Sequence, residues 1–135
     1  MAADIDRIIR ETRTVAIVGA STNRARAVYG VWKYLESASD YELFLVNPTI
    51  GDVEGTPTYP NLAALPVVPD LVDVFRRREY LPSVLDEAIA VGAKTLWLQS
   101  GLWDEQVARR GEAAGLRVVM DRCLKVEHAR LLSVR

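Results

Sequence analysis

Apolar residues along the chain gather in five short runs that are rich in β-branched side chains. The runs occupy residues 14–19, 41–47, 70–75, 94–99 and 116–121. Each run is nearly continuous and does not alternate strictly with polar residues, which is typical of a strand whose two faces are both covered in a parallel sheet. The pattern therefore predicts five parallel strands.

The longer stretches place apolar residues at helical spacing. They predict helices over residues 4–12, 27–38, 80–92 and 104–115. Gly92 and Gly115 stand where helices commonly end, whereas Gly111 lies inside the last predicted helix, where glycine is unfavourable. Strands that alternate with helices through right-handed crossovers favour an α/β fold, with a doubly wound sheet and helices on both faces.

The stretch at residues 48–69 interrupts this alternation. It contains all but one of the six prolines. We expect a long surface connection with one short helix that begins after Asn61. After the last predicted strand we expect the chain to continue as a tail.

The composition is that of one globular domain over residues 1–135, because a chain of this length buries one core but not two. A net charge of −1 excludes a global field for nucleic acid or an anionic membrane. The apolar runs are too short to span a membrane and the charged N-terminus lacks a signal-peptide core, so we expect a cytoplasmic protein. One cysteine and one histidine exclude a disulfide framework and a Cys/His zinc site.

The turn after the first predicted strand has the features of an anion site. In the segment VAIVGASTNRARAVYGVW (15–32) the strand ends at Gly19, and a helical pattern resumes after two arginines. Backbone N–H groups and the helix dipole attract phosphate at such a junction. Polar groups are available from Ser21, Thr22, Asn23, Arg24 and Arg26. The alternative is an ordinary turn with solvated arginines.

A dinucleotide cofactor such as NAD(P) or FAD fits this turn poorly. The dinucleotide fingerprint requires three glycines in the order G-x-G-x-x-G, whereas this turn supplies only Gly19. The second predicted strand ends in Asn47 and Pro48, where a dinucleotide site carries an acidic residue for the ribose. An NAD(P)-type oxidoreductase is therefore disfavoured.

Polar residues follow the other predicted strands as well, and the carboxyl ends of parallel strands meet at one edge of the sheet. They are Asn47-Pro48-Thr49, residues 76–78, Gln99-Ser100-Gly101 and Asp121-Arg122-Cys123. We expect Arg76 and Arg77 to reach a ligand at this edge, and Arg78 to be solvated.

Two residues at this edge are candidates for catalysis. Cys123 follows the last predicted strand, and Arg122 and Lys125 nearby would favour its thiolate. The only base available to it is His128, and the alternative is a structural cysteine. Asp121 is either a catalytic carboxylate or a hydrogen-bonding end to the strand.

Five segments in this order resemble the strand ends of the stand-alone CoA-binding domain proteins, which are similar to the amino-terminal CoA-binding domain of the succinyl-CoA synthetase α subunit. The segments are VAIVGAS, FLVNP, DLVDVFRR, AKTLWLQSG and GLRVVMDRC, within a resemblance that runs from residue 12 to 128. The resemblance implies a Rossmann-like domain that binds coenzyme A at the carboxyl edge of a five-stranded sheet.

The resemblance also implies which residues contact the ligand. The phosphates would lie at Gly19, Ala20, Ser21, Asn23 and Arg24. The adenosine side would be lined by Val46, Asn47 and Pro48, and the third and fourth strand ends would add Phe75, Arg76, Gln99, Ser100 and Gly101. Cys123 at the fifth strand end would lie near the CoA thiol.

The synthetase continues into a second domain with a histidine that is phosphorylated, whereas His128 matches no such motif, so we expect no ligase chemistry. The leading hypothesis is a non-enzymatic module that binds CoA or an acyl-CoA, with a second copy or another protein as its partner. This hypothesis involves no metal, no nucleic acid and no membrane. The alternative is an enzyme that acts on an acyl-CoA or another nucleotide thioester through Cys123 or Asp121.

Overall fold

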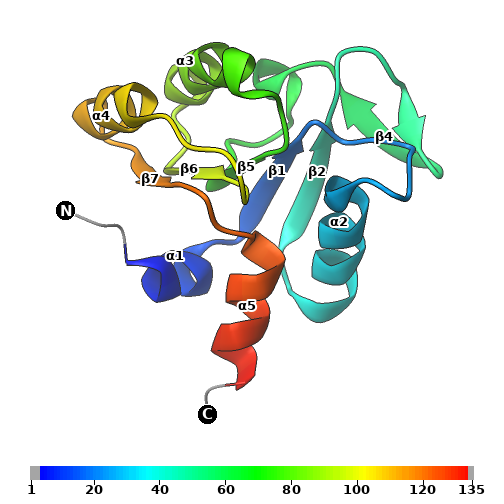
Figure 1. Cartoon of the computed structure of the whole chain (residues 1–135). Coiled ribbons are helices and arrows are strands. Elements are labelled where there is room, and N and C mark those ends of the chain that lie inside the picture. The colour runs from blue at the N-terminus through cyan, green and yellow to red at the C-terminus, as the bar shows by residue number, and fades with distance from the viewer. Residues whose placement is uncertain (1–3, 134–135) are drawn as a thin grey trace.

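The computed structural model describes residues 4–133 and shows a central sheet flanked by helices (Figure 1). The strands are β1 (Thr14–Val18), β2 (Glu42–Val46), β3 (Asp52–Val53), β4 (Thr56–Tyr59), β5 (Leu71–Val74), β6 (Thr95–Leu98) and β7 (Arg117–Val119). The helices are α1 (Ile5–Glu11), α2 (Ala27–Ala38), α3 (Leu81–Val91), α4 (Glu105–Ala113) and α5 (Leu124–Ser133), with two short 3₁₀ helices, η1 (Leu62–Ala64) and η2 (Arg78–Tyr80). No helix within residues 4–133 is long and apolar enough to cross a membrane.

The sheet has the strand order β3-β4-β2-β1-β5-β6-β7, and its pairs are parallel except for the antiparallel pair of β3 and β4. The strand β1 pairs with β2 on one side and with β5 on the other, so the winding of the chain reverses at β1. The predicted α/β, doubly wound architecture is confirmed. The five predicted strands are present as β1, β2, β5, β6 and β7, and β3 and β4 extend the sheet to seven strands.

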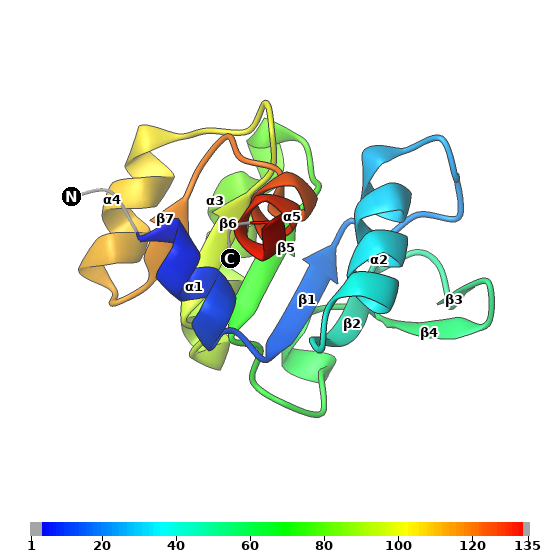
Figure 2. The ribbon, with the colours of Figure 1, turned by 90° about the horizontal axis from the view of Figure 1, so that it is seen from below.

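Helices cover both faces of the sheet, as predicted (Figures 1 and 2). One layer contains α3 and α4, and the other contains α1, α2 and α5. Successive side chains of a strand point to opposite faces, so on β5 Val72 and Val74 join the first layer and Leu71 joins the second. All three are fully buried, as expected of a central strand covered on both faces.

Gly111 inside α4 has a packing role. A Cβ atom at this position would lie 2.8 Å from Val118 Cγ2 of β7 and 3.3 Å from Leu85 Cδ1 of α3. Glycine therefore lets α4 lie close to β7 and α3, and this packing offsets its low helix propensity. The helix predicted over residues 104–115 is confirmed, with Asp104 as its N-cap.

The predicted surface connection at residues 48–69 is wrong in part. The short helix η1 begins after Asn61, as predicted, but β3 and β4 form a hairpin at the edge of the sheet. Its two-residue turn holds Glu54 at φ 51° and Gly55 at φ 89°, which is the left-handed geometry of a tight hairpin. The two strands are too short and too polar for an apolar pattern to reveal them.

The expected tail after the last strand is instead the helix α5, which lies beside α1 and α2 (Figure 2). Its buried residues are Leu124, Glu127 and His128. The inner side of α5 therefore mixes one apolar side chain with two polar ones, and the sequence shows no apolar stripe there.

Candidate functional site

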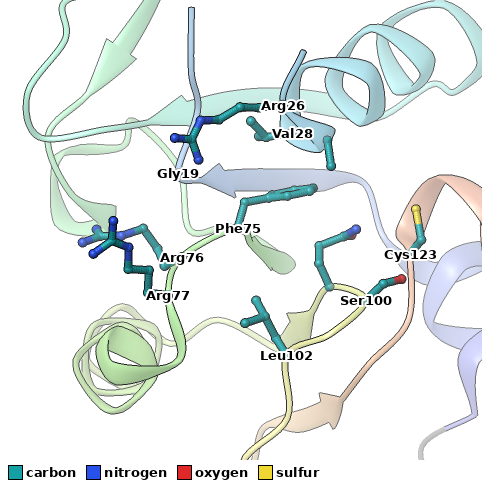
Figure 3. A pocket seen from close by; sticks show the side chains of 11 residues that line it. Gly19, Arg26, Val28, Phe75, Arg76, Arg77, Ser100, Leu102 and Cys123 are labelled. Carbon is teal, nitrogen blue, oxygen red and sulfur yellow. The ribbon is translucent and has the colours of Figure 1, made fainter. Parts of the chain in front are cut away.

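A cavity of about 520 Å³ opens at the carboxyl edge of the sheet, beyond the ends of β1, β5 and β6 (Figure 3). It lies at the position where the winding of the chain reverses, which is where doubly wound sheets bind their ligands. From the predicted set, the residues that line it are Gly19, Phe75, Arg76, Gln99, Ser100 and Cys123.

The N-terminus of α2 opens into this cavity through Ala27 and Val28. Arg26 occupies the N-cap position, and its side chain makes no capping hydrogen bond within the described part of the chain. The first N–H groups of a helix lack acceptors inside the helix and, together with the helix dipole, attract anions. The start of α2 is therefore suited to an anionic ligand group.

The backbone N–H groups of Gly19 and Ala20 are already used inside the protein. Both donate to the carbonyl oxygen of Val46, at 3.0 and 3.3 Å, and so join the end of β1 to the end of β2. Gly19 has φ +98°, and a Cβ atom there would lie 2.9 Å from the carbonyl carbon of Phe75. The single glycine thus serves the close approach of β1 and β5, and this turn lacks the glycine-lined backbone of a dinucleotide site.

Side chains that were predicted at the phosphates order the loop itself. Ser21 Oγ accepts a hydrogen bond from the Asn23 N–H at 3.0 Å, and Asn23 Oδ1 accepts one at 2.9 Å from the N–H two residues further on. Arg24 extends to the β3–β4 hairpin, where its Nε lies 2.7 Å from Glu54 Oε2. None of these loop side chains lines the cavity.

Glu54 ties the β3–β4 hairpin to this loop. It accepts hydrogen bonds from Arg24 and, at 3.0 Å, from the Tyr29 hydroxyl on α2. Burial would raise the pKa of Glu54, but these two hydrogen bonds, together with the positive charges of Arg24 and Lys33, outweigh it and hold the pKa below its usual value. The positive charge of Arg24 is therefore balanced by a carboxylate of the protein.

Three arginines form a basic end of the cavity (Figure 3). Arg26 precedes α2, and Arg76 and Arg77 follow Phe75, the residue after β5. The Arg76 guanidinium lies 4.3 Å from the centre of the Tyr80 ring, a stacking contact that orients it. None of the described acidic residues lines the cavity. This end therefore favours anions such as phosphate.

A second cavity of about 140 Å³ shares Arg76 with the first and is lined by Val46 and Pro48 from the predicted adenosine side. Asn47 lies between these two residues but braces the loops. Its Nδ2 donates to a carbonyl of the β1–α2 turn at 2.7 Å, and its Oδ1 accepts from the Thr49 N–H at 2.7 Å. The end of β2 thus offers an apolar wall beside an arginine, and β2 itself ends without a carboxylate. The carboxylate that lines this cavity is Glu87 of α3, whose Oε1 accepts a hydrogen bond from the Leu62 N–H at 3.1 Å.

The end of the larger cavity away from the arginines is formed by Ser100 and Cys123 (Figure 3). Cys123 is half-buried and immediately precedes α5. Gln99 Oε1 accepts a hydrogen bond from the Leu124 N–H at 3.1 Å. This bond fixes the start of α5, and with it Cys123, to the end of β6.

The two catalytic candidates, Asp121 and Cys123, have no activating base beside them among residues 4–133. Asp121 Oδ1 accepts from the Gly101 N–H at 2.7 Å, so Asp121 is a hydrogen-bonding end to its strand. His128 is buried outside the cavity that Cys123 lines, and its Nδ1 lies 2.9 Å from the Tyr34 hydroxyl. Burial lowers the pKa of His128. The chain's only histidine thus contacts Tyr34 and lies outside the cavity that Cys123 lines.

A buried carboxyl group at Asp73, in β5, was missed by the sequence analysis. Asp73 is completely buried, and neither carboxyl oxygen has a hydrogen-bond partner among residues 4–133. Burial raises the pKa of Asp73 well above its usual range and so favours the neutral acid. An aspartate within the apolar run DLVDVF was a usable signal, because carboxyl groups are rarely buried without a function or a partner.

The structure separates the other predicted site residues from the cavity. Ala20, Ser21, Asn23, Arg24, Asn47 and Gly101 line neither cavity and instead support the surrounding loops. Arg77 lines the cavity, as expected, whereas Arg78 lies outside it with its guanidinium 5.4 Å from the centre of the Trp103 ring. The cavity adds Ala27, Val28 and Leu102, which the sequence analysis did not name. The expected helix start after the phosphate loop could have indicated the first two.

The fold and the position of the cavity define a Rossmann-like domain with a ligand cavity where its winding reverses. Residues 13–129 match the model of the CoA binding domain family. The chain belongs to this family, which confirms the resemblance drawn from the strand-end motifs.

Two similar proteins share nearly the full length of the chain. The uncharacterized protein YneT of Bacillus subtilis (strain 168) is 36% identical over 127 residues, which cover 94% of this chain and 93% of YneT. The structure of a hypothetical protein from Pyrococcus horikoshii OT3 superposes with a TM-score of 0.88 at 34% identity, and the match covers 96% of this chain and 90% of that one.

A third relative is much longer than this chain. The ADP-forming acetate–CoA ligase I of Archaeoglobus fulgidus is 23% identical over 122 residues, which cover 83% of this chain but 18% of the ligase. The similarity therefore concerns a small part of that enzyme.

Proposed function

We propose that this protein is a module that binds coenzyme A or an acyl-CoA without turning it over. The observation that carries the proposal is the basic end of the larger cavity, where Arg26, Arg76 and Arg77 meet the open N-terminus of α2. CoA carries a diphosphate and a 3′-phosphate on its adenosine, and these groups match the cluster in charge. Membership of the CoA-binding domain family supports the same ligand.

The two cavities suit the two halves of CoA. The smaller cavity offers Val46 and Pro48 to the adenine beside Arg76, which is shared by both cavities and would bind the phosphates between them. The larger cavity then receives the pantetheine arm along Phe75 and Leu102. NAD fits less well, because Gly19 is the only glycine of the turn and β2 is followed by an asparagine.

Binding without turnover is the form of the proposal that the site supports. A nucleophilic cysteine needs a base within hydrogen-bonding reach, and the histidine of this chain is bound to Tyr34 outside the cavity. Asp121 is engaged with a backbone N–H at the neighbouring strand end. Cys123 therefore lacks a histidine base in the described cavity, and the Asp121 carboxylate is already hydrogen-bonded. Both observations weigh against an enzyme that acts on an acyl-CoA through either residue.

Thermal unfolding in the presence of CoA, NAD or ADP tests the proposal. A ligand that binds only the folded protein raises the free energy of unfolding by RT ln(1 + [L]/Kd), which is about 1.4 kcal/mol at about ten times Kd. We expect submillimolar CoA to raise the melting temperature and NAD at the same concentration to leave it unchanged. A larger shift with NAD than with CoA would contradict the proposal.

Two arginine variants locate the binding site. Arg76→Gln removes a charge from the cavity and is expected to weaken CoA binding by about tenfold or more, because hydrogen bonds to charged groups contribute about 1.5–3 kcal/mol. Arg109→Gln removes the same charge from the exposed side of α4, away from the cavity, and is expected to change the affinity little. Calorimetric titration with CoA measures both, and equal losses would place the phosphates elsewhere.

A further inference from the structure

The larger cavity has two chemically different ends. Arg26, Arg76 and Arg77 lie at one end, Ser100 and Cys123 lie at the other, and the Phe75 ring lies between them (Figure 3). CoA has the same polarity, because its phosphates and its thiol are at opposite ends of the molecule. A ligand whose phosphates bind the arginines would therefore direct its thiol toward Cys123.

Cys123 is held in place at the thiol end. It is the only cysteine of the chain, and its sulfur is in no disulfide. The Cys123 carbonyl accepts the Glu127 N–H at 3.0 Å in the first turn of α5, and the N–H of the next residue, Leu124, donates to the Gln99 side chain at 3.1 Å. The backbone on both sides of this half-buried thiol is thus fixed while the side chain lines the cavity.

A buried carboxyl group lies in the strand that leads to the cavity wall. Asp73 shares a face of the sheet with Phe75, two residues further on, because side chains of a strand alternate. It pairs across the sheet with Trp97, whose indole N–H donates to the Arg122 carbonyl at 2.8 Å. The layer that contains the Asp73 carboxyl group therefore lies directly beneath Phe75 and contacts the segment that carries Cys123.

The Asp73 carboxyl group is a polar group that the fold itself does not use. It is fully buried in β5, it does not line the cavity, and both of its oxygens are without partners in the described chain. Burying such a group is costly, and costs of this kind are retained where a group serves a ligand or a reaction. The fold thus keeps an unpartnered polar group two residues before Phe75, which lines the cavity.

We propose that Cys123 captures the thiol end of the bound ligand as a mixed disulfide, an inference that rests on the proposed function of CoA binding. The Cys123 thiolate attacks one sulfur of CoA disulfide, and the sulfur–sulfur bond of that disulfide breaks. A new bond forms between Cys123 Sγ and one CoA. The second CoA leaves as a thiolate and takes up the proton that Cys123 released. The disulfide supplies the oxidising equivalents, and a thiol reductant reverses the exchange.

Intact-protein mass spectrometry after incubation with CoA disulfide tests this inference. We expect an adduct of one CoA per chain that is lost on addition of dithiothreitol and is absent from Cys123→Ser. Glutathione disulfide offers the same bond without the adenosine phosphates, so it should react at least about tenfold more slowly at equal concentration. Arg76→Gln should slow the reaction with CoA disulfide and leave the reaction with glutathione disulfide unchanged.

Equal rates with the two disulfides would overturn the inference, because Cys123 would then be an accessible thiol without guidance from a binding site. Calorimetric titration of folded Cys123→Ser, or of Cys123→Ala, with reduced CoA separates this inference from the proposed function. If the variant binds CoA and the wild type forms no adduct, the mixed disulfide is wrong and CoA binding stands. If neither binding nor adduct is found, both are wrong.

Discussion

Gly19 joins two strand ends at the point where the cavity begins. Its φ of +98° is unfavourable for any residue with a side chain, and a Cβ atom would meet the backbone of Phe75. The side chain of Phe75 in turn lies in the cavity wall between the arginines and Cys123 (Figure 3). A single residue thus sets how closely β1 and β5 approach under the ligand.

Gly19→Ala is expected to lower the free energy of unfolding by at least about 2 kcal/mol, because backbone strain and a clash with main-chain atoms add. Gly30→Ala is the matched control. Gly30 is exposed on α2, and no atom of the described residues outside its own helix backbone and chain neighbours lies within 4 Å of a Cβ there. Alanine at position 30 should stabilise the helix by about 0.5–1 kcal/mol. Urea unfolding measures both, and a Gly19→Ala variant as stable as the wild type would show that the strand end shifts freely.

At the scale of elements, the β3–β4 hairpin contacts the loop between β1 and α2 through Glu54. Glu54 has φ 51°, an uncommon conformation for a residue with a side chain. In this position its carboxylate binds Arg24 and Tyr29. The hairpin therefore places a negative charge beside the loop that joins β1 to α2.

Glu54→Gln is expected to tighten CoA binding by a few fold, because Arg24 loses its carboxylate partner and becomes available to a phosphate. Asp52→Asn removes the same charge from the same hairpin, where Asp52 Oδ2 accepts only the Gly55 N–H among the described contacts, at 2.9 Å. This control should leave the affinity nearly unchanged. Calorimetric titration at low and high salt compares the two variants. Weaker binding by Glu54→Gln would show instead that the tie to Arg24 positions the loop for the ligand.

The sequence predicts those elements that bury a continuous apolar run or stripe. The strands β1, β2, β5, β6 and β7 and the helices α1 to α4 are of this kind, and Gly92, at φ 80°, ends α3 as its position indicated. The hairpin and α5 were not predicted because they are held by contacts distant in the sequence. In α5, for example, the buried His128 is hydrogen-bonded to Tyr34 of α2.

The candidate site was predictable in the position of its residues but not in the direction of their side chains. Parallel strands must end at a common edge, and Phe75, Arg76 and Gln99 line the cavity for that reason. The direction of a side chain was not predictable. Arg24 and Arg26 are two residues apart, but Arg26 lines the cavity whereas Arg24 binds Glu54. Glu54 follows Arg24 by 30 residues in the chain, so the sequence alone does not reveal this contact.

For the whole molecule, two aspartates of one short segment affect stability in opposite ways. Asp70 precedes β5 and accepts the N–H groups of Arg13 and Thr14 at 2.9 and 3.2 Å. Burial would raise the pKa of Asp70, but these hydrogen bonds, together with the charge of Lys94 and the Thr14 hydroxyl, outweigh it and lower the pKa. Its contribution to stability is therefore present above the pKa of the unfolded chain and lost only in acid. Asp73, three residues further on, has the opposite shift because burial acts alone.

Asp73→Val is expected to raise the free energy of unfolding, and to raise it more as the pH increases from about 5 to about 8. In the wild type the folded protein retains the Asp73 proton, whereas the unfolded chain releases it above about pH 3.9. Release of this proton therefore stabilises the unfolded state relative to the folded state by about 1.4 kcal/mol for each pH unit, until the pH reaches the pKa of Asp73 in the folded protein. Valine has no proton to release and adds apolar contact beside Ile17 and Trp97, the neighbours of Asp73 in the sheet.

Urea unfolding of wild type, Asp73→Val and Asp70→Asn at a series of pH values in this range measures the effect. Asp70→Asn should be destabilised by a nearly constant amount, because the lowered pKa of Asp70 places its titration below the range. Since the other ionisable groups are common to both proteins, the pH dependence of the difference in unfolding free energy between Asp73→Val and wild type reports the titration of Asp73. A difference that is independent of pH would show that Asp73 is ionised in the folded protein and has found a partner.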